Sequence, residues 1–164
     1  MNPIVDERTT IRFAQESEVG LILQFIKDLA AYEELLDSVT ATEEIIRKTI
    51  FQDKRAEVLF CDYDQQTVGF AVFFHNFSTF NGKPGLYLED LYVKPEMRNK
   101  GIGKKIMSAL GTIAIERDCG RFEWICLDWN KKSIDFYLGL GAEAMSDWTI
   151  YKVSGPELRK LSNS

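Results

Sequence analysis

The sequence predicts an α/β fold in which helices cover both faces of one mixed sheet. Three observations support this: apolar runs that alternate as in strands, apolar stripes with helical spacing, and a glycine-rich turn that directly follows an apolar strand. The chain has 164 residues, of which 45% are apolar, enough for one well-packed core and too few for two. We therefore expect a single domain over residues 1–164.

The first third of the chain predicts one strand and two helices. Residues 9–13 alternate as in a strand, and residues 18–36 carry a helical stripe of apolar side chains. A second, shorter helix begins at Thr42 and ends near Asp53-Lys54. The stripe of the first helix includes Ile22, Phe25, Ile26 and Leu29.

The middle of the chain predicts a hairpin followed by a central strand. Residues 57–61 and 67–74 are apolar runs on either side of a polar turn, which indicates two antiparallel strands. A loop is expected over residues 76–85, before the strand that starts at Leu86. The turn signals in this loop are Asn81-Gly82 and Pro84-Gly85.

The rest of the chain predicts a long helix, a strand, a short helix and a closing strand. The long helix starts at Ile102 and ends near Cys119, with Gly120 as its cap. The later elements are a buried strand over residues 122–127, a helix over residues 133–138 and a strand over residues 148–153. Both strand–helix–strand connections should be right-handed crossovers.

A glycine-rich turn lies between the central strand and the long helix. It reads Arg98-Asn99-Lys100-Gly101-Ile102-Gly103. Small glycines let backbone N–H groups converge on an anion, and the helix N-terminus adds unpaired donors and a partial positive charge. The turn also lies at the carboxyl end of a strand, where open α/β sheets bind their ligands. We expect it to bind a phosphate; the alternative is a tight turn alone, the commonest use of glycine.

Two better-known glycine motifs do not match this turn. A Walker P-loop needs a glycine in place of Arg98 and a serine or threonine in place of Lys105. A dinucleotide fingerprint needs a third glycine in place of Ile106.

Charge and cysteine content exclude several classes of protein. The formal net charge of -5 disfavours general binding to nucleic acids and to anionic membranes. The three cysteines form no CxxC pair, and the single His75 cannot complete a zinc site with them, so no metal is expected. The chain shows no cleavable leader and no apolar run of about 18 residues, which favours a cytoplasmic protein.

Five segments carry a resemblance to a known family: Ile26-Lys27-Asp28-Leu29-Ala30-Ala31-Tyr32-Glu33, Tyr87-Leu88-Glu89-Asp90, Arg98 to Gly103, Asp128-Trp129-Asn130, and Phe136-Tyr137-Leu138-Gly139-Leu140-Gly141-Ala142. With them, the whole chain resembles the GCN5-related N-acetyltransferase (GNAT) family, and within it the diamine (spermidine/spermine) and thialysine N-acetyltransferases. The resemblance implies the GNAT fold, with a mostly antiparallel central sheet, acetyl-CoA as co-substrate, a small-molecule amine as acceptor, and a homodimer.

The resemblance also implies where acetyl-CoA binds. Its pyrophosphate should meet the turn amides, with the charges of Arg98, Lys104 and Lys105 nearby, and its pantetheine arm should pair with the backbone of residues 91–93. Asn130 should contact the far side of the arm; the alternative, a plain N-cap of the next helix, is compatible with this. The full set implied is Leu91, Tyr92, Val93, Arg98, Asn99, Lys100, Gly101, Ile102, Gly103, Lys104, Asn130, Lys131, Ser133 and Tyr137.

Acetyl transfer needs a base and an acid. Alkylamines titrate near pH 10, so only about one molecule in a thousand is neutral at pH 7. The resemblance makes Glu89 the base, acting through water, and Tyr137 the acid that protonates the leaving thiolate. Alternatively, Tyr137 is a half-buried aromatic. Strand alternation places Glu89 and Asp90 on opposite faces unless a β-bulge intervenes, and Asp90 is either a substrate residue or a solvated or helix-capping carboxylate.

The amine site implied by the resemblance consists of Tyr32, Glu33, Glu89, Asp90, Glu123, Trp124 and Ile125. Residues 77–82 lack the acidic residue that polyamine-acetylating members carry there, which favours a shorter amine. Two alternatives to a small-molecule acetyltransferase remain: a CoA-binding regulatory module without turnover, and a protein or peptide N-acetyltransferase on the same fold.

Overall fold

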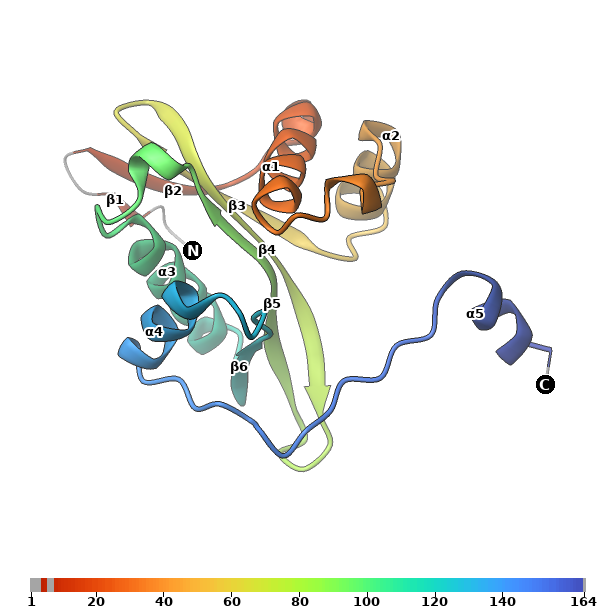
Figure 1. Ribbon diagram of the computed structural model, residues 1–164. Helices are drawn as coiled ribbons and strands as arrows, with labels where there is room; N and C mark the ends of the chain where they lie inside the picture. Colours follow the sequence, from red (N-terminus) through yellow and green to blue (C-terminus); the bar gives the residue numbers. More distant parts are fainter. Residues whose placement is uncertain (1–3, 6–7, 164) are drawn as a thin grey trace. The chain divides into compact units, whose positions relative to one another are not determined.

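The computed structural model describes residues 4–5 and 8–163. The chain forms two compact units, which divide between Ile125 and Cys126. The first unit contains the sheet and the helices packed on it, and the second contains two short helices (Figure 1). Among the described residues, no helix is both long enough and apolar enough to cross a membrane.

The first unit is built on one six-stranded sheet whose strands lie side by side in sequence order. Neighbouring strands are antiparallel except β5 and β6, which are parallel. The strands are β1 (Ile4–Val5), β2 (Thr9–Phe13), β3 (Glu57–Tyr63), β4 (Gln66–Ser78), β5 (Lys83–Val93) and β6 (Arg121–Trp124). The predicted mixed, mostly antiparallel sheet is thus confirmed.

Helices and helical turns connect these strands. Before the hairpin come η1 (Glu16–Glu18), α1 (Val19–Tyr32), η2 (Leu36–Ser38), α2 (Glu43–Ile46) and the π-helical turn η3 (Arg47–Gln52). After β5 come η4 (Pro95–Met97) and α3 (Ile102–Glu116), and the second unit holds α4 (Lys131–Gly139) and α5 (Gly155–Leu161). As predicted, the second helical segment starts at the N-cap Thr42, whose hydroxyl accepts a hydrogen bond from the N–H of Ile45.

Helices α1 and α3 cover opposite faces of the sheet, as expected (Figure 1). Phe25 of α1 packs its ring against Phe60 and Phe70, at centroid distances of 5.8 and 5.1 Å. Neighbouring residues of the same strands point to the other face of the sheet, where Phe73 and the apolar stripe of α3 are buried. The buried side chains of α3 are Ile102, Ile106, Met107, Ala109, Leu110, Ile113 and Ala114.

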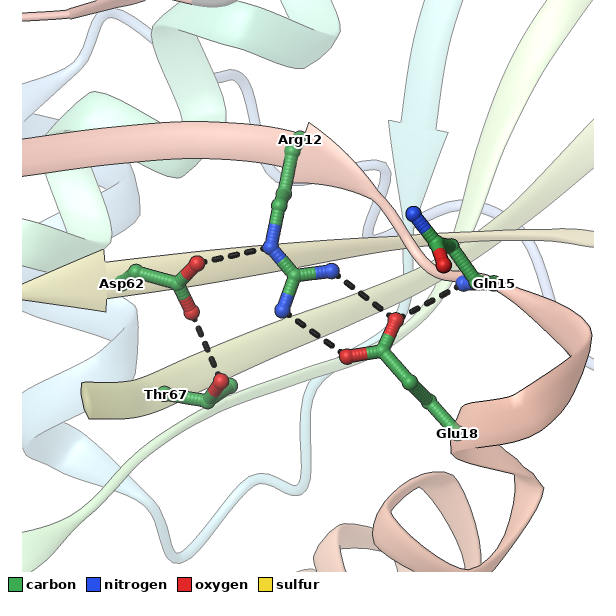
Figure 2. A network of polar contacts seen from close by, with 5 residues as sticks. All are labelled: Arg12, Gln15, Glu18, Asp62 and Thr67. Carbon is green, nitrogen blue, oxygen red and sulfur yellow. Dashed lines mark hydrogen bonds and ion pairs between the residues drawn. The ribbon is translucent and has the colours of Figure 1, made fainter. Parts of the chain in front are cut away.

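An ion-pair network fixes the start of α1 to the sheet (Figure 2). The guanidinium of Arg12 donates to both carboxylate oxygens of Glu18, at 2.8 and 2.9 Å, and to Asp62 at 2.6 Å. Thr67 donates to the other oxygen of Asp62, and the backbone N–H of Gln15 donates to Glu18. The hydrogen bond from Arg12 lowers the pKa of Glu18. The network therefore orients α1, the helix that ends at Tyr32.

Two predicted boundaries shift. The first helix ends at Tyr32 rather than at residue 36, because Glu34 adopts a positive φ of 61°, which no right-handed helix allows. The hairpin between β3 and β4 is confirmed and turns at two residues only. Asp64 and Gln65 both have positive φ, 48° and 66°, as a tight two-residue hairpin turn requires.

The predicted loop over residues 76–85 is wrong. β4 and β5 pair through most of it, and only Thr79 to Gly82 form the turn, with Gly82 at a φ of 64°. Gly85 lies inside β5, where a Cβ atom would be 2.2 Å from Oδ1 of Asn76. That glycine therefore permits a close approach between strands rather than a turn.

The end of the long helix and the strand after it also differ from the prediction. α3 ends at Glu116, and Asp118, not Gly120, adopts the left-handed conformation, with a φ of 52°. The predicted buried strand over residues 122–127 is β6, which ends at Trp124 and is only partly buried. The connection from β5 through α3 to the parallel strand β6 is one of the two predicted crossovers, and its right-handedness stays a prediction.

The closing strand predicted over residues 148–153 is wrong: in the described second unit these residues form neither helix nor strand. A strand is stable only where a neighbouring edge pairs with its backbone, and no described strand pairs with this segment. The described residues therefore do not contain the second predicted crossover, and α5 was not predicted. The single domain over residues 1–164 stays a prediction.

Candidate active site

A β-bulge in β5 decides which acidic side chains share a face. Val72 of β4 pairs with Asp90, and the next residue, Phe73, pairs with Leu88, so Glu89 is the extra residue. Paired residues of antiparallel strands point to the same face. Asp90 therefore lies on the face of Val72, the face covered by α1, whereas Leu88 lies on the α3 face. The β-bulge, which the sequence allowed as one of two possibilities, is therefore present at Glu89.

Three carboxylates gather near the bulge. Burial raises the pKa of Asp90 to about 6, and the negative charges of Glu89 and Glu33 contribute to the shift. Glu33 is the C-cap of α1, and burial raises its pKa as well. Glu89 is exposed. A site with several partly desolvated carboxylates gains free energy when a cation binds, because the cation relieves their mutual repulsion.

Glu123 lies on β6, opposite Tyr87 of β5. Its carboxylate accepts a hydrogen bond from Nδ2 of Asn76 at 2.9 Å and pairs with Nε of Arg121 at 2.9 Å. Its charge contributes to the raised pKa of Tyr87, which comes first from burial and then from Glu89. Asn76 and Arg121 were not predicted as site residues. Sequence gives no sign of a contact between Asn76 and a carboxylate 47 positions away.

Two further predicted amine-site residues, Trp124 and Ile125, lie at the end of β6. The ring of Trp124 packs edge-on against Phe122, with centroids 4.9 Å apart. Ile125, the next residue, is exposed.

β5 extends past its parallel neighbour. The pairing with β6 ends at Leu88 and Trp124, whereas β5 continues to Val93. In the part of the chain that the structure describes, no strand pairs with Leu91 to Val93 on that side. The backbone groups of this edge can therefore pair with an extended ligand, as a bound peptide adds a strand to a sheet.

The glycine turn opens α3 as predicted. Gly101 is the N-cap, with a φ of 78°, and Asn99 has a φ of 62°. The first hydrogen bond of the helix joins the N–H of Lys105 to the carbonyl of Gly101, at 3.0 Å. The N–H groups of residues 102–104 therefore point out of the end of the helix. This donor set fits a pyrophosphate group.

The cationic side chains near the turn differ in orientation. Lys104 is exposed in the first turn of α3, whereas Nζ of Lys105 donates to the hydroxyl of Thr9 on β2 at 2.8 Å. Nζ of Lys100 lies 3.5 Å from Sδ of Met97. The side chain of Arg98 donates from Nε to the carbonyl of Val93 at 3.0 Å.

The remaining predicted residues lie together on α4 in the second unit. Asn130 is the N-cap of this helix, and its side chain accepts a hydrogen bond from the N–H of Ser133 at 3.3 Å, so the expected capping role is present. Lys131 is the first residue of the helix. Tyr137 is partly buried, with its ring 5.3 Å from that of Phe136.

Comparison with protein families gives a match over most of this chain. The model of the acetyltransferase (GNAT) family matches residues 24–142. The chain is 36% identical to a thialysine N-epsilon-acetyltransferase of Bos taurus, over 93% of this chain and 96% of that protein. It is 33% identical to a spermidine/spermine N(1)-acetyltransferase-like protein 1 of Homo sapiens, over 93% of this chain and 23% of that protein.

Solved structures share the fold. An integron cassette protein from the mobile metagenome of V. cholerae superimposes with a TM-score of 0.81, over 97% of this chain and all of that one. The sequences of the two are 24% identical, so this match bears on the fold alone.

Proposed function

The chain belongs to the acetyltransferase (GNAT) family, and from this premise we propose that it transfers the acetyl group of acetyl-CoA directly to a primary amine of a small molecule. One observation carries the proposal: Glu33, Glu89 and Asp90 lie near one another at the bulge, directly before the open edge of β5. That edge suits an extended thioester arm, and the carboxylates suit an ammonium group. We further propose that residues 1–164 act as one catalytic domain.

Acetyl-CoA is assigned to the turn and the edge of β5. The backbone N–H groups from Asn99 to Lys104 bind the pyrophosphate, aided by the partial charge of the α3 N-terminus. The open edge at Leu91 to Val93 pairs with the pantetheine arm and offers an N–H to the thioester carbonyl. We assign the N-terminus of α4, with Asn130, Lys131 and Ser133, to the same ligand on the basis of the family resemblance.

The amine is assigned to the carboxylates near the bulge, with Tyr32, Glu123, Trp124 and Ile125 as further contacts. Asp90 and Glu33 bind the ammonium form, because both are partly desolvated and regain free energy beside a cation. Glu89, exposed at the bulge, takes one proton from the ammonium group through a water molecule. The neutral nitrogen then attacks the thioester carbon, the carbon–sulfur bond breaks, and Tyr137 gives its proton to the leaving thiolate. The nitrogen loses its second proton as the amide forms, and this proton passes through water to restore the phenol of Tyr137.

Replacing Asp90 by asparagine should stabilise the protein at pH 8 while weakening amine binding. Because burial raises the pKa of Asp90 from 3.8 to about 6, folding favours the protonated form. Asp90 therefore does not lower the free energy of unfolding below about pH 4. It lowers it increasingly as the pH rises from 4 to 6, and above that range by its full amount, about 1–3 kcal/mol. Urea unfolding at pH 4.5 and pH 8 measures this gain, and the KM for the amine should rise by about 10-fold or more.

Asp64 provides the matched control. It is an exposed aspartate whose pKa is lowered by its hydrogen bond to Arg8, so Asp64→Asn should give no gain in stability at pH 8. If Asp90→Asn is as stable as the wild type at both pH values and has the wild-type KM, Asp90 is neither desolvated nor a substrate residue.

The choice of amine tests the proposed function directly. A polyamine has cationic centres far apart and needs acidic groups at more than one place, whereas residues 77–82 offer none. The similarity to a thialysine N-epsilon-acetyltransferase points the same way. We expect kcat/KM for thialysine to exceed that for spermidine by about 10-fold or more, since each unmatched charge contact costs about 1–3 kcal/mol.

Thiol release from acetyl-CoA, measured across thialysine, lysine, spermidine, spermine and aminoalcohols at one pH and salt concentration, decides the point. Spermidine turnover equal to that of thialysine would mean that another carboxylate, such as Asp147, completes a polyamine site. Acetyl-CoA binding without turnover of any amine would favour a regulatory module. Turnover of peptides alone would favour a protein acetyltransferase.

We also propose that the protein works in the cytoplasm as a homodimer, without a nucleic acid, membrane or metal partner. The odd number of cysteines, with no CxxC pair, suits a reducing compartment. The net charge of -5 supports the absence of anionic macromolecular partners. The homodimer is implied by the family resemblance, and light scattering coupled to gel filtration measures it.

A further inference from the structure

The side chain of Arg98 makes contacts beyond the turn to which it belongs. Its guanidinium carbon lies 4.5 Å from the ring centroid of Tyr32 and 5.5 Å from that of Tyr92. Its Nε donates to the carbonyl of Val93 at 3.0 Å. A guanidinium can stack on a ring and donate in its own plane at the same time, which an ammonium group cannot do.

These contacts join the two halves of the proposed site. Val93 and Tyr92 belong to the edge of β5 that is assigned to the pantetheine arm, and Tyr92 also packs edge-on against Phe25 of α1. Tyr32 is the last residue of α1, and the next residue is Glu33, one of the carboxylates assigned to the amine. Arg98 itself directly precedes the turn amides assigned to the pyrophosphate.

We propose that Arg98 is a positioning residue whose side chain, stacked on Tyr32 and bonded to the carbonyl of Val93, holds the end of α1 and thereby Glu33 in place for the amine. This inference rests on the proposed function.

Two substitutions of Arg98 separate this role from direct binding of the pyrophosphate. Arg98→Lys keeps the positive charge and loses the planar fork, whereas Arg98→Met loses both. If Arg98 positions Tyr32, both variants should raise the amine KM by roughly 10-fold and leave the Kd of acetyl-CoA within about 3-fold of the wild type. If the guanidinium instead binds the pyrophosphate, Arg98→Met alone should weaken acetyl-CoA binding strongly, and that result would overturn the proposal.

Tyr32 completes the test. Tyr32→Leu should raise the amine KM as Arg98→Lys does, and the double variant should be no worse than either single one, because both remove the same contact. Tyr32→Phe keeps the ring on which Arg98 stacks, so in that background Arg98→Lys should still raise the amine KM by roughly 10-fold. Additive effects on KM, or a lower melting temperature with unchanged KM and kcat, would contradict the proposal. An inactive wild type would instead refute the proposed function, and this inference with it.

Discussion

Replacing Gly103 by valine is expected to weaken acetyl-CoA binding on the order of 10²-fold while the protein stays folded. Gly103 lies in the first turn of α3 and is not one of the glycines with positive φ, so its backbone conformation is open to any residue. A side chain there would instead occupy the space over the helix N-terminus. It would separate the amides from the pyrophosphate and remove hydrogen bonds to a charged group worth about 1.5–3 kcal/mol each.

Calorimetric titration with acetyl-CoA measures this loss, and thermal melting checks the fold. Gly111→Val is the matched control, because Gly111 lies in the same helix and a Cβ atom built on it has no heavy atom within 4 Å. That variant should bind acetyl-CoA as the wild type does. A Gly103→Val protein with wild-type affinity would reduce the glycine pair to a tight turn.

Replacing Tyr137 by phenylalanine should lower kcat by about 10²-fold or more, with little change in the Kd of acetyl-CoA. The reference pKa values of a phenol and a thiol lie within about two units of each other, so a proton moves between two such groups at little cost. Phenylalanine keeps the ring that packs beside Phe136 and loses the hydroxyl group that carries the proton. The loss should therefore fall on the chemical step.

Steady-state kinetics and calorimetry on the same preparation separate the two quantities. Tyr151→Phe makes the same chemical change at a tyrosine that is 91% exposed, and it should leave kcat unchanged. A near-normal kcat for Tyr137→Phe would make Tyr137 a packing residue, the alternative that its sequence position also allows. A lower kcat together with a lost affinity for acetyl-CoA would place Tyr137 in coenzyme binding instead.

Sequence by itself determined most of the scaffold, since the patterns that encode it are local. The hairpin, the stripe of α1 and the stripe of α3 follow from apolar periodicities of 2 and 3.6 residues, which need no knowledge of distant residues. The glycine turn was found in the same way, and Gly101 does adopt the left-handed conformation at the N-cap of α3. Local patterns failed where pairing decides, as at residues 76–85 and 148–153.

Only the tertiary structure decided how the predicted side chains meet. The register of β4 against β5 fixed the bulge at Glu89 and so the face of Asp90. Burial raises the pKa of Asp90, and the charges of Glu89 and of Glu33, at the end of α1, add to the shift. The stacking of Arg98 on Tyr32 likewise joins residues far apart in the chain. Register, desolvation and stacking depend on which segments lie side by side, and no pattern within one segment encodes that.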